Sequence, residues 1–177
     1  MIIRAFTPDD VDIFREIRLA ALRANPEAFG SSYEIEQAQP LGVARERLQN
    51  RHGSPDNFVL GAWTEADDVV GMMGLFRQTS PKEQHKGGVW GVFVRPEWRG
   101  QGIAAQLLDE LLKRARQLDG LEQLQLSVVT EQAAAVRLYQ SRGFQTYGLE
   151  REALRDSDRY VDEYHMVLFL KEMGREN

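Results

Sequence analysis

The stretch WRGQGIA, Trp98–Ala104, stands where a β-like segment gives way to a long amphipathic pattern. Glycines at positions 100 and 102 leave backbone N–H groups uncovered by side chains. The first amides of a helix also lack intrahelical acceptors and lie at the positive end of the helix dipole. The stretch therefore predicts an anion site suited to phosphate, with Arg99 adding positive charge at its edge. The alternative is a tight turn that needs only the conformational freedom of glycine.

Two familiar phosphate-binding loops do not match this stretch. A P-loop ends in Gly-Lys-Ser or Gly-Lys-Thr, whereas Ile103 and Ala104 follow the second glycine here. A dinucleotide-binding fingerprint requires a third glycine in register within a parallel βαβ unit. Neither loop fits, so the anion site belongs to another class of protein.

Composition excludes several other classes. The chain has 177 residues, of which 42% are hydrophobic, which is enough for one domain with a real core. A net charge of −5 speaks against binding nucleic acid through a basic surface. The absence of cysteine excludes disulfides, thiolate metal sites and a cysteine nucleophile. We see neither a signal-peptide core in MIIRAFTPDD nor an apolar run near the ~20 residues that span a bilayer, and expect a soluble cytoplasmic protein without membrane contact.

Segments with strand and helix patterns alternate along the chain, without a linker or an internal repeat. The stretch from Asn25 to Pro40 is loop-like. The expected strands are Ile2–Phe6, Phe58–Thr64, Val69–Phe76, Val89–Val94, Leu121–Val129, Phe144–Leu149 and Tyr164–Leu170, and helices are expected after Thr7, over Leu41–Arg51, from Ile103 and over Ala133–Ser141. This pattern predicts a mixed α/β (α+β) fold with a largely antiparallel sheet, as a single domain over residues 1–177.

Two motifs in this order resemble the GNAT family of N-acetyltransferases. The signature Arg/Gln-x-x-Gly-x-Gly/Ala of that family is matched from Arg99 to Ala104, after a strand with a proline-containing exit, VFVRPEWRG. The downstream segment AAAVRLYQSRGF resembles the second family motif, with Leu138 and Tyr139 followed by Gly143 and Phe144. The resemblance covers about Phe58 to Leu170, with a compatible strand and helix pair before it.

The resemblance implies a central sheet with helices on both faces, in which the fourth and fifth strands splay apart. It also implies acetyl-CoA as the ligand, with its pyrophosphate bound at the anion site. The pantetheine arm would pair with the exposed backbone of the fourth strand. Gln132 stands where relatives often have an asparagine that contacts the arm, so that contact departs from the family pattern. The implied acetyl-CoA-binding residues are Val92, Phe93, Val94, Arg99, Gly100, Gln101, Gly102, Ile103, Ala104, Gln132 and Tyr139.

Acetyl transfer to an amine sets three chemical tasks, which are to deprotonate the amine, stabilise the oxyanion and protonate the departing thiolate. Tyr139 occupies the motif position that suits the third task, with a buried structural tyrosine as the alternative. For the oxyanion the family offers a backbone N–H of the fourth strand, here that of Phe93 or Val94. Many relatives carry a carboxylate base on this strand, but the sequence reads Val-Trp-Gly from Val89.

The identity of the general base is therefore open between several groups. The candidates are Glu34, Glu36, Glu83, His85 and a chain of water molecules. Glu34 ranks first, because the loop that carries it walls the acceptor site in this family. The alternative for each of these side chains is a solvated surface group.

The function expected from the resemblance is transfer of an acetyl group from acetyl-CoA to a primary amine by direct attack in a ternary complex. A non-catalytic acyl-CoA-binding regulator is the alternative, since a fold does not fix a function. The acceptor is open between a small-molecule amine and a protein amine. The three histidines, His52, His85 and His165, are too far apart in sequence to suggest a metal site. The resemblance is also compatible with an antiparallel homodimer.

Overall fold

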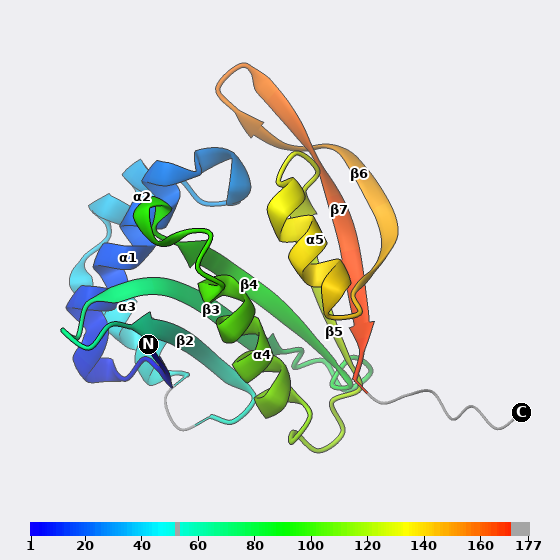
Figure 1. The fold of residues 1–177 in the computed structure, drawn as a ribbon, viewed down its shortest axis with the longest axis horizontal. Coiled ribbons are helices and arrows are strands. Elements are labelled where there is room, and N and C mark those ends of the chain that lie inside the picture. Colours follow the sequence, from blue (N-terminus) through cyan, green and yellow to red (C-terminus); the bar gives the residue numbers. More distant parts are fainter. Residues whose placement is uncertain (52–53, 171–177) are drawn as a thin grey trace, which may run out of the picture.

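The computed structural model describes residues 1–51 and 54–170, and its seven strands form one sheet in the order β1-β2-β3-β4-β5-β7-β6 (Figure 1). The strands are β1 (Ile2–Ala5), β2 (Asn57–Trp63), β3 (Val69–Arg77), β4 (Lys86–Val94), β5 (Gln123–Val129), β6 (Gln145–Asp156) and β7 (Arg159–Phe169). All neighbouring strands are antiparallel except β4 and β5, which are parallel. The expected mixed and mainly antiparallel fold is confirmed.

Helices cover both faces of this sheet. The α-helices are α1 (Val11–Ala24), α2 (Tyr33–Ala38), α3 (Leu41–Gln49), α4 (Ile103–Ala115) and α5 (Ala133–Ser141), and short 3-10 turns form η1 (Pro8–Asp10), η2 (Pro26–Ala28) and η3 (Pro96–Trp98). Because side chains alternate along a strand, Val59 and Met72 pack into the core under α1 and α3. Their neighbours Leu60 and Met73 pack into the core under α4. Figure 1 shows α4 and α5 in front of the sheet.

The sheet opens between β4 and β5. These two strands pair only over residues 86–88 of β4 and residues 123–125 of β5. Further along, β4 stays paired with β3 as far as Val94, and β5 stays paired with β7 as far as Val129. The two halves of the sheet therefore diverge, and the expected splay of the fourth and fifth strands is confirmed.

A β-bulge lies on β4 where the splay begins to widen. Gly91 and Val92 together stand opposite the single residue Met73 of β3. Gly91 has φ +63°, a conformation that glycine adopts without the steric cost of a Cβ atom. A bulge of this kind bends its strand and redirects the following residues. Sequence analysis did not predict it.

The structure corrects two expected segments. The stretch taken as a loop contains α2, a short helix whose first turn is capped by the Ser32 Oγ, which accepts a hydrogen bond from the Ile35 N–H at 3.3 Å. The last two strands are longer than expected, because they continue past a bulge between Glu150 and Leu154 into a projecting hairpin. At this bulge Glu152 has φ +53°, and its N–H donates to the Asp162 carboxylate at 2.8 Å.

A buried ion pair anchors α2 to α1. The guanidinium of Arg18 donates to both carboxylate oxygens of Glu36, at 2.8 Å in the shortest bond, and only 8% of the Glu36 side chain is exposed. Arg47 of α3 adds a second cation at 3.6 Å. Burial alone would raise the pKa of Glu36, but the hydrogen bonds and charge of Arg18 outweigh it, so the net pKa lies below its ordinary value.

We expect Glu36→Gln to lower the free energy of unfolding by about 3 kcal/mol at neutral pH, since it leaves the buried Arg18 without its counter-ion. The lowered pKa means that the wild type holds this contribution above the unfolded-state pKa of Glu36 and loses it as pH falls through the folded-state pKa. Urea denaturation at pH 7 and in acid measures both effects. Glu34→Gln, two positions away on the exposed side of α2, is the matched control. Equal stability of the two variants at pH 7 would contradict the anchoring role.

Candidate active site

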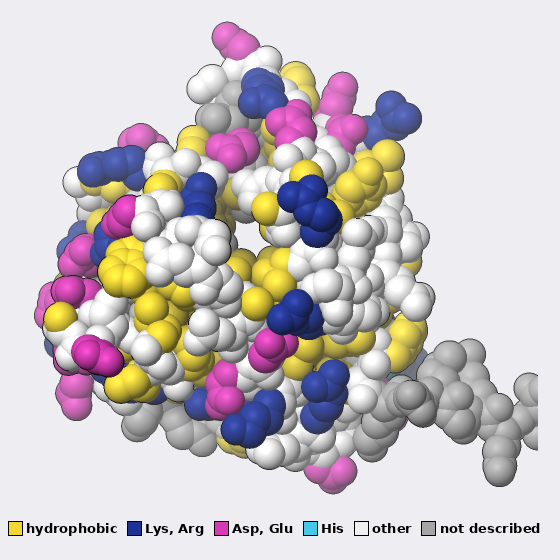
Figure 2. Space-filling model, in the orientation of Figure 1, with side chains coloured by type: hydrophobic (Ala, Val, Ile, Leu, Met, Phe, Trp, Pro, Cys, Tyr) yellow, Lys and Arg dark blue, Asp and Glu magenta, His cyan; other side chains and the backbone are white. Residues whose placement is uncertain are grey.

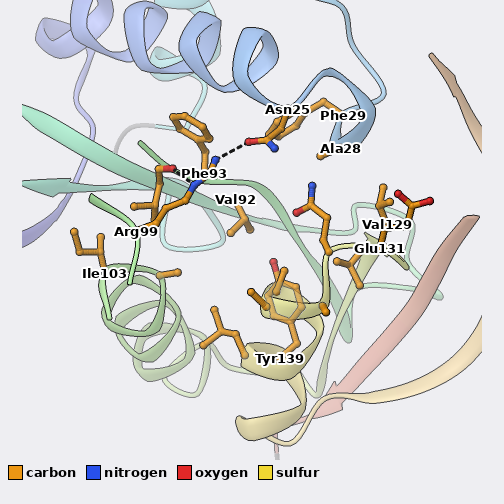
Figure 3. A pocket seen from close by; sticks show the side chains of 18 of the residues that line it. Asn25, Ala28, Phe29, Val92, Phe93, Arg99, Ile103, Val129, Glu131 and Tyr139 are labelled. Carbon is orange, nitrogen blue, oxygen red and sulfur yellow. Dashed lines mark hydrogen bonds between the residues drawn. The ribbon is translucent and has the colours of Figure 1, made fainter. Parts of the chain in front are cut away.

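A cavity of about 800 Å³ occupies the opening between β4 and β5. Figure 2 shows it as a hollow in the centre of the face that carries α4 and α5. Its walls come from the ends of β4 and β5, the turn before α4, one side of α5, and the η2 segment with its flanking residues (Figure 3). The volume is within the range of small-molecule sites in proteins.

The turn before α4 forms a cradle of backbone N–H groups at one end of this cavity. Gly100 and Gly102 have φ +77° and +74°, in the left-handed region that favours glycine. The first hydrogen bond of the helix runs from the Gln106 N–H to the Gly102 carbonyl at 3.0 Å. Within the described chain, no group accepts a hydrogen bond from the backbone N–H groups of residues 100–105. Gly100, Gly102, Ile103 and Ala104 line the cavity, whereas Gln101 is exposed and does not.

Arg99 holds this cradle in place. Its Nε donates to the Val94 carbonyl at 3.0 Å, and its Nη2 donates to the Asn25 Oδ1 at 2.7 Å, the latter drawn in Figure 3. The side chain thus ties the end of β4 to the end of α1 while it lines the cavity. Sequence analysis predicted its charge at the site but not this bracing role.

Removal of the Arg99 guanidinium by Arg99→Ala is expected to weaken acetyl-CoA binding about 10-fold at low ionic strength, and less at high salt. A charge-assisted hydrogen bond contributes about 1.5–3 kcal/mol, and salt screens an exposed charge. Arg99→Lys keeps the positive charge but loses the pair of hydrogen bonds to Val94 and Asn25. It should therefore restore most of the salt-dependent part of the acetyl-CoA affinity. Titration calorimetry at two salt concentrations measures both. A loss of affinity that is independent of salt, and equal in the two variants, would show that Arg99 acts as a brace alone.

The facing edges of β4 and β5 form the long walls of the cavity. Val92, Phe93 and Val94 line it from β4, and Val128 and Val129 line it from β5. Because the two strands form no ladder with each other here, their backbone groups on these edges are available to a ligand. A ligand with amide groups can pair with such an edge as an added strand does.

Tyr139 projects into the cavity from α5. Figure 3 shows its hydroxyl directed upward into the cavity from the helix. The side chain is buried, and its ring meets the edge of Phe144 at a centroid distance of 5.8 Å. Burial raises the pKa of Tyr139 well above its ordinary value, so the phenol stays protonated at neutral pH. The hydroxyl has no hydrogen-bond partner within the part of the chain that the structure describes, and it can donate a proton to a ligand.

The η2 segment lines the cavity and reaches the N-terminus of α5. The Glu27 Oε1 accepts from the Asn25 Nδ2 at 3.4 Å and from the Gln132 Nε2 at 3.5 Å. Gln132, at the N-terminus of α5, therefore lines the cavity with its amide directed to Glu27. Sequence analysis missed Glu27, although it belongs to the same stretch as Glu34. Glu131 also lines the cavity and is paired with Arg159 of β7.

The carboxylates and histidine that the sequence offered as bases do not line this cavity. Glu34 is exposed on α2, and Glu36 is held in its ion pair between α1 and α3. Glu83 and His85 precede β4, and the His85 carbonyl accepts from the Glu122 and Gln123 N–H groups where β4 and β5 are still paired. That place is the closed end of the splay.

The described residues contain neither a metal-binding cluster nor a membrane-spanning helix. Within residues 1–51 and 54–170, no group of three or more His, Cys, Asp or Glu side chains could hold a metal ion. In the same ranges, no helix is long and apolar enough to cross a membrane. His52 lies outside the described residues.

The fold and this site define a class of protein in which the sheet opens into a cavity between two splayed strands. Residues 16–144 match the model of the acetyltransferase (GNAT) family. The chain belongs to the GNAT family and is an acetyl-CoA-dependent N-acetyltransferase.

Individual relatives agree with this assignment. The L-amino acid N-acetyltransferase AaaT of Escherichia coli is 25% identical over 94% of this chain and 96% of its own. The N-alpha-acetyltransferase RimI of Mycobacterium tuberculosis is 39% identical over 64% of this chain and 66% of its own. The structure of YncA, a putative acetyltransferase from Salmonella typhimurium with its cofactor acetyl-CoA, has a TM-score of 0.82 at 21% identity and covers 100% of this chain and 98% of its own.

Proposed function

We propose that the protein, a single N-acetyltransferase domain, transfers the acetyl group of acetyl-CoA to a primary amine by direct attack in a ternary complex. The observation that carries this proposal is the continuity of the cavity. It joins the free amides of residues 100–105 to the Tyr139 hydroxyl along the unpaired edges of β4 and β5. The amides suit the pyrophosphate, and the strand edges suit the pantetheine arm.

In the proposed reaction the amine nitrogen attacks the thioester carbonyl carbon, so that a C–N bond forms and the C–S bond then breaks. A backbone N–H of Phe93 or Val94 donates to the oxyanion of the tetrahedral intermediate. Tyr139 gives its proton to the departing sulfur, a role that its protonated state at neutral pH allows. The amine must also lose a proton, and Glu34, which the sequence ranked first as base, is exposed and does not line the cavity.

For the acceptor we propose a small-molecule amine of the amino-acid type. The relative AaaT, which is aligned over nearly the whole of both chains, is named for acetylating L-amino acids. Glu27 of η2 also bonds to Gln132 where both residues line the cavity, and a cavity bridged in this way favours a small acceptor over a folded protein. A protein N-terminus is the second candidate, favoured by the higher identity to RimI over part of the chain. We also propose a cytoplasmic location, since acetyl-CoA is available there.

A panel of amines tests this function. Purified enzyme with acetyl-CoA is offered the free L-amino acids, spermidine and an unblocked peptide, and both CoA thiol and acetylated product are measured. We expect one acetylated product for each CoA released, with free amino acids preferred over the peptide. Binding of acetyl-CoA without release of CoA for any amine would instead favour a non-catalytic acyl-CoA-binding regulator.

A further inference from the structure

The half of the sheet formed by β5, β7 and β6 presents a polar face on the side away from α4 and α5. On β5, Leu126 and Val128 point into the core under these helices, so Ser127 between them points to the opposite face. His165 of β7 is the direct cross-strand partner of Ser127. Glu150 of the edge strand β6 shares this face, and these three side chains lie at neighbouring positions across three strands.

These three side chains form a continuous hydrogen-bonded chain. The Ser127 Oγ lies 2.9 Å from the His165 Nδ1, and the His165 Nε2 lies 2.8 Å from a Glu150 carboxylate oxygen. An ionised carboxylate can only accept, so the neutral imidazole carries its proton on Nε2 and donates it to Glu150. Nδ1 is then an acceptor, and the Ser127 hydroxyl donates to it. The chain is thus oriented to move a proton from Ser127 toward Glu150.

The chain begins at the edge of the splay. Gln125 is the last residue of β5 that pairs with β4, so Ser127 lies on the part of β5 that borders the opening. Its neighbour Val128 lines the cavity. The amide cradle and Tyr139 belong to elements on the α4 and α5 side, which leaves the opposite face for the acceptor. Ser127 itself is exposed on that face and does not line the cavity, and an amine that approached the thioester from that face would pass it.

We propose that Ser127, His165 and Glu150 relay the proton that the acceptor amine must lose. This inference rests on the proposed function. As the ammonium gives a proton to the Ser127 oxygen, directly or through one water molecule, the serine hydroxyl proton moves to the His165 Nδ1. The imidazole becomes a cation, which the Glu150 carboxylate stabilises, and the neutral amine attacks the thioester carbonyl. The relay supplies the base that the Val-Trp-Gly stretch of β4 lacks.

Two further side chains lie near the imidazole. Glu163 lies on the same face of β7, and the Tyr147 ring of β6 is 6.0 Å from the imidazole by centroid distance. Burial raises the pKa of Glu163, and the Glu150 charge raises it further while His165 lowers it. Ser127 from β5 and Glu150 from β6 contact the two ring nitrogens directly.

The test compares His165→Gln with the wild type on two nucleophiles. One is the best amine of the panel, which is protonated at neutral pH, and the other is hydroxylamine, which is largely unprotonated there. For the amine we expect kcat/KM to fall about 100-fold at pH 7, within the range of general base catalysis, and the defect to shrink as pH rises. For hydroxylamine we expect a change of less than about threefold, because no proton needs to be removed before attack.

Ser127→Ala should show the same dependence on pH and nucleophile as His165→Gln. The kcat/KM of the double variant for the amine should be no lower than that of the more impaired single variant. Gln125→Ala, on the same face of β5 but outside the chain, is the matched control and should leave both activities unchanged. A His165→Gln defect that is equal at all pH values, equal for both nucleophiles, or reproduced by Gln125→Ala would overturn the relay. If the wild type acetylates no amine, the proposed function fails instead, so the two failures are distinguishable.

Discussion

Gly102→Asp is expected to weaken acetyl-CoA binding about 30-fold in a protein that stays folded. A Cβ at position 102 meets no atom within 4 Å, so the substitution causes no clash. It does place a negative charge at the N-cap of α4, next to the amides that we assign to the pyrophosphate. Two like charges a few ångströms apart repel by up to ~4 kcal/mol near a protein surface, and screening by salt leaves about 2 kcal/mol.

Gly102→Asn is the matched control for this prediction. Asparagine has nearly the shape of aspartate and, like it, tolerates the φ of +74° better than most residues, but it carries no charge. Calorimetric titration of both variants with acetyl-CoA separates charge from backbone strain, and thermal unfolding reports the strain alone. If the two variants bind acetyl-CoA equally well, the amides of residues 100–105 do not hold its phosphates.

Tyr139→Phe is expected to lower kcat about 100-fold while stability and acetyl-CoA affinity stay close to wild type. The ring, which supplies the packing against Phe144, is retained. What is lost is a buried hydroxyl whose raised pKa keeps it protonated at neutral pH, and thus the proton for the departing sulfur. General acid catalysis contributes ~10²–10⁴-fold, and the low end applies because a thiol, with an ordinary pKa of ~8.5, is a fairly good leaving group.

Because the lost interaction exists only in the transition state, kcat and kcat/KM should fall together when chemistry limits the rate. Tyr164→Phe removes a hydroxyl from a tyrosine that packs on the same core but does not line the cavity, and it serves as the control. Single-turnover rates give the chemical step directly. A Tyr139→Phe rate within twofold of wild type would leave Tyr139 as a core residue with no part in proton transfer.

The features that sequence analysis predicted are those encoded locally. The glycines of WRGQGIA were interpreted as a turn feeding a helix, because the residues at that turn decide its backbone conformation, and both glycines adopt positive φ values in the structure. The amphipathic period after Ile103 marks α4 for the same reason. The splay of β4 from β5 came from the family resemblance, since nothing in either strand taken alone indicates that their pairing stops after Gly88.

The features that it missed depend on residues far apart in the chain. The short helix α2 is anchored by the ion pair of Glu36 with Arg18, a contact across 18 positions that no local pattern shows. The projecting β6–β7 hairpin needs the Glu152 bulge and its bond to Asp162. Ser127 and His165 face each other only because β5 and β7 pair in one particular register, which places them 38 positions apart in sequence but 2.9 Å apart in space.

Analysis of a single turnover tests direct acetyl transfer most directly. Enzyme in excess over acetyl-CoA is quenched with and without the best amine of the panel, and the masses of the intact protein and of the amine product are recorded. We predict unmodified protein in both samples and, with the amine present, one acetylated amine for each CoA released. Acetyl groups on the protein in the absence of amine, passed on when amine is added, would contradict direct attack in a ternary complex.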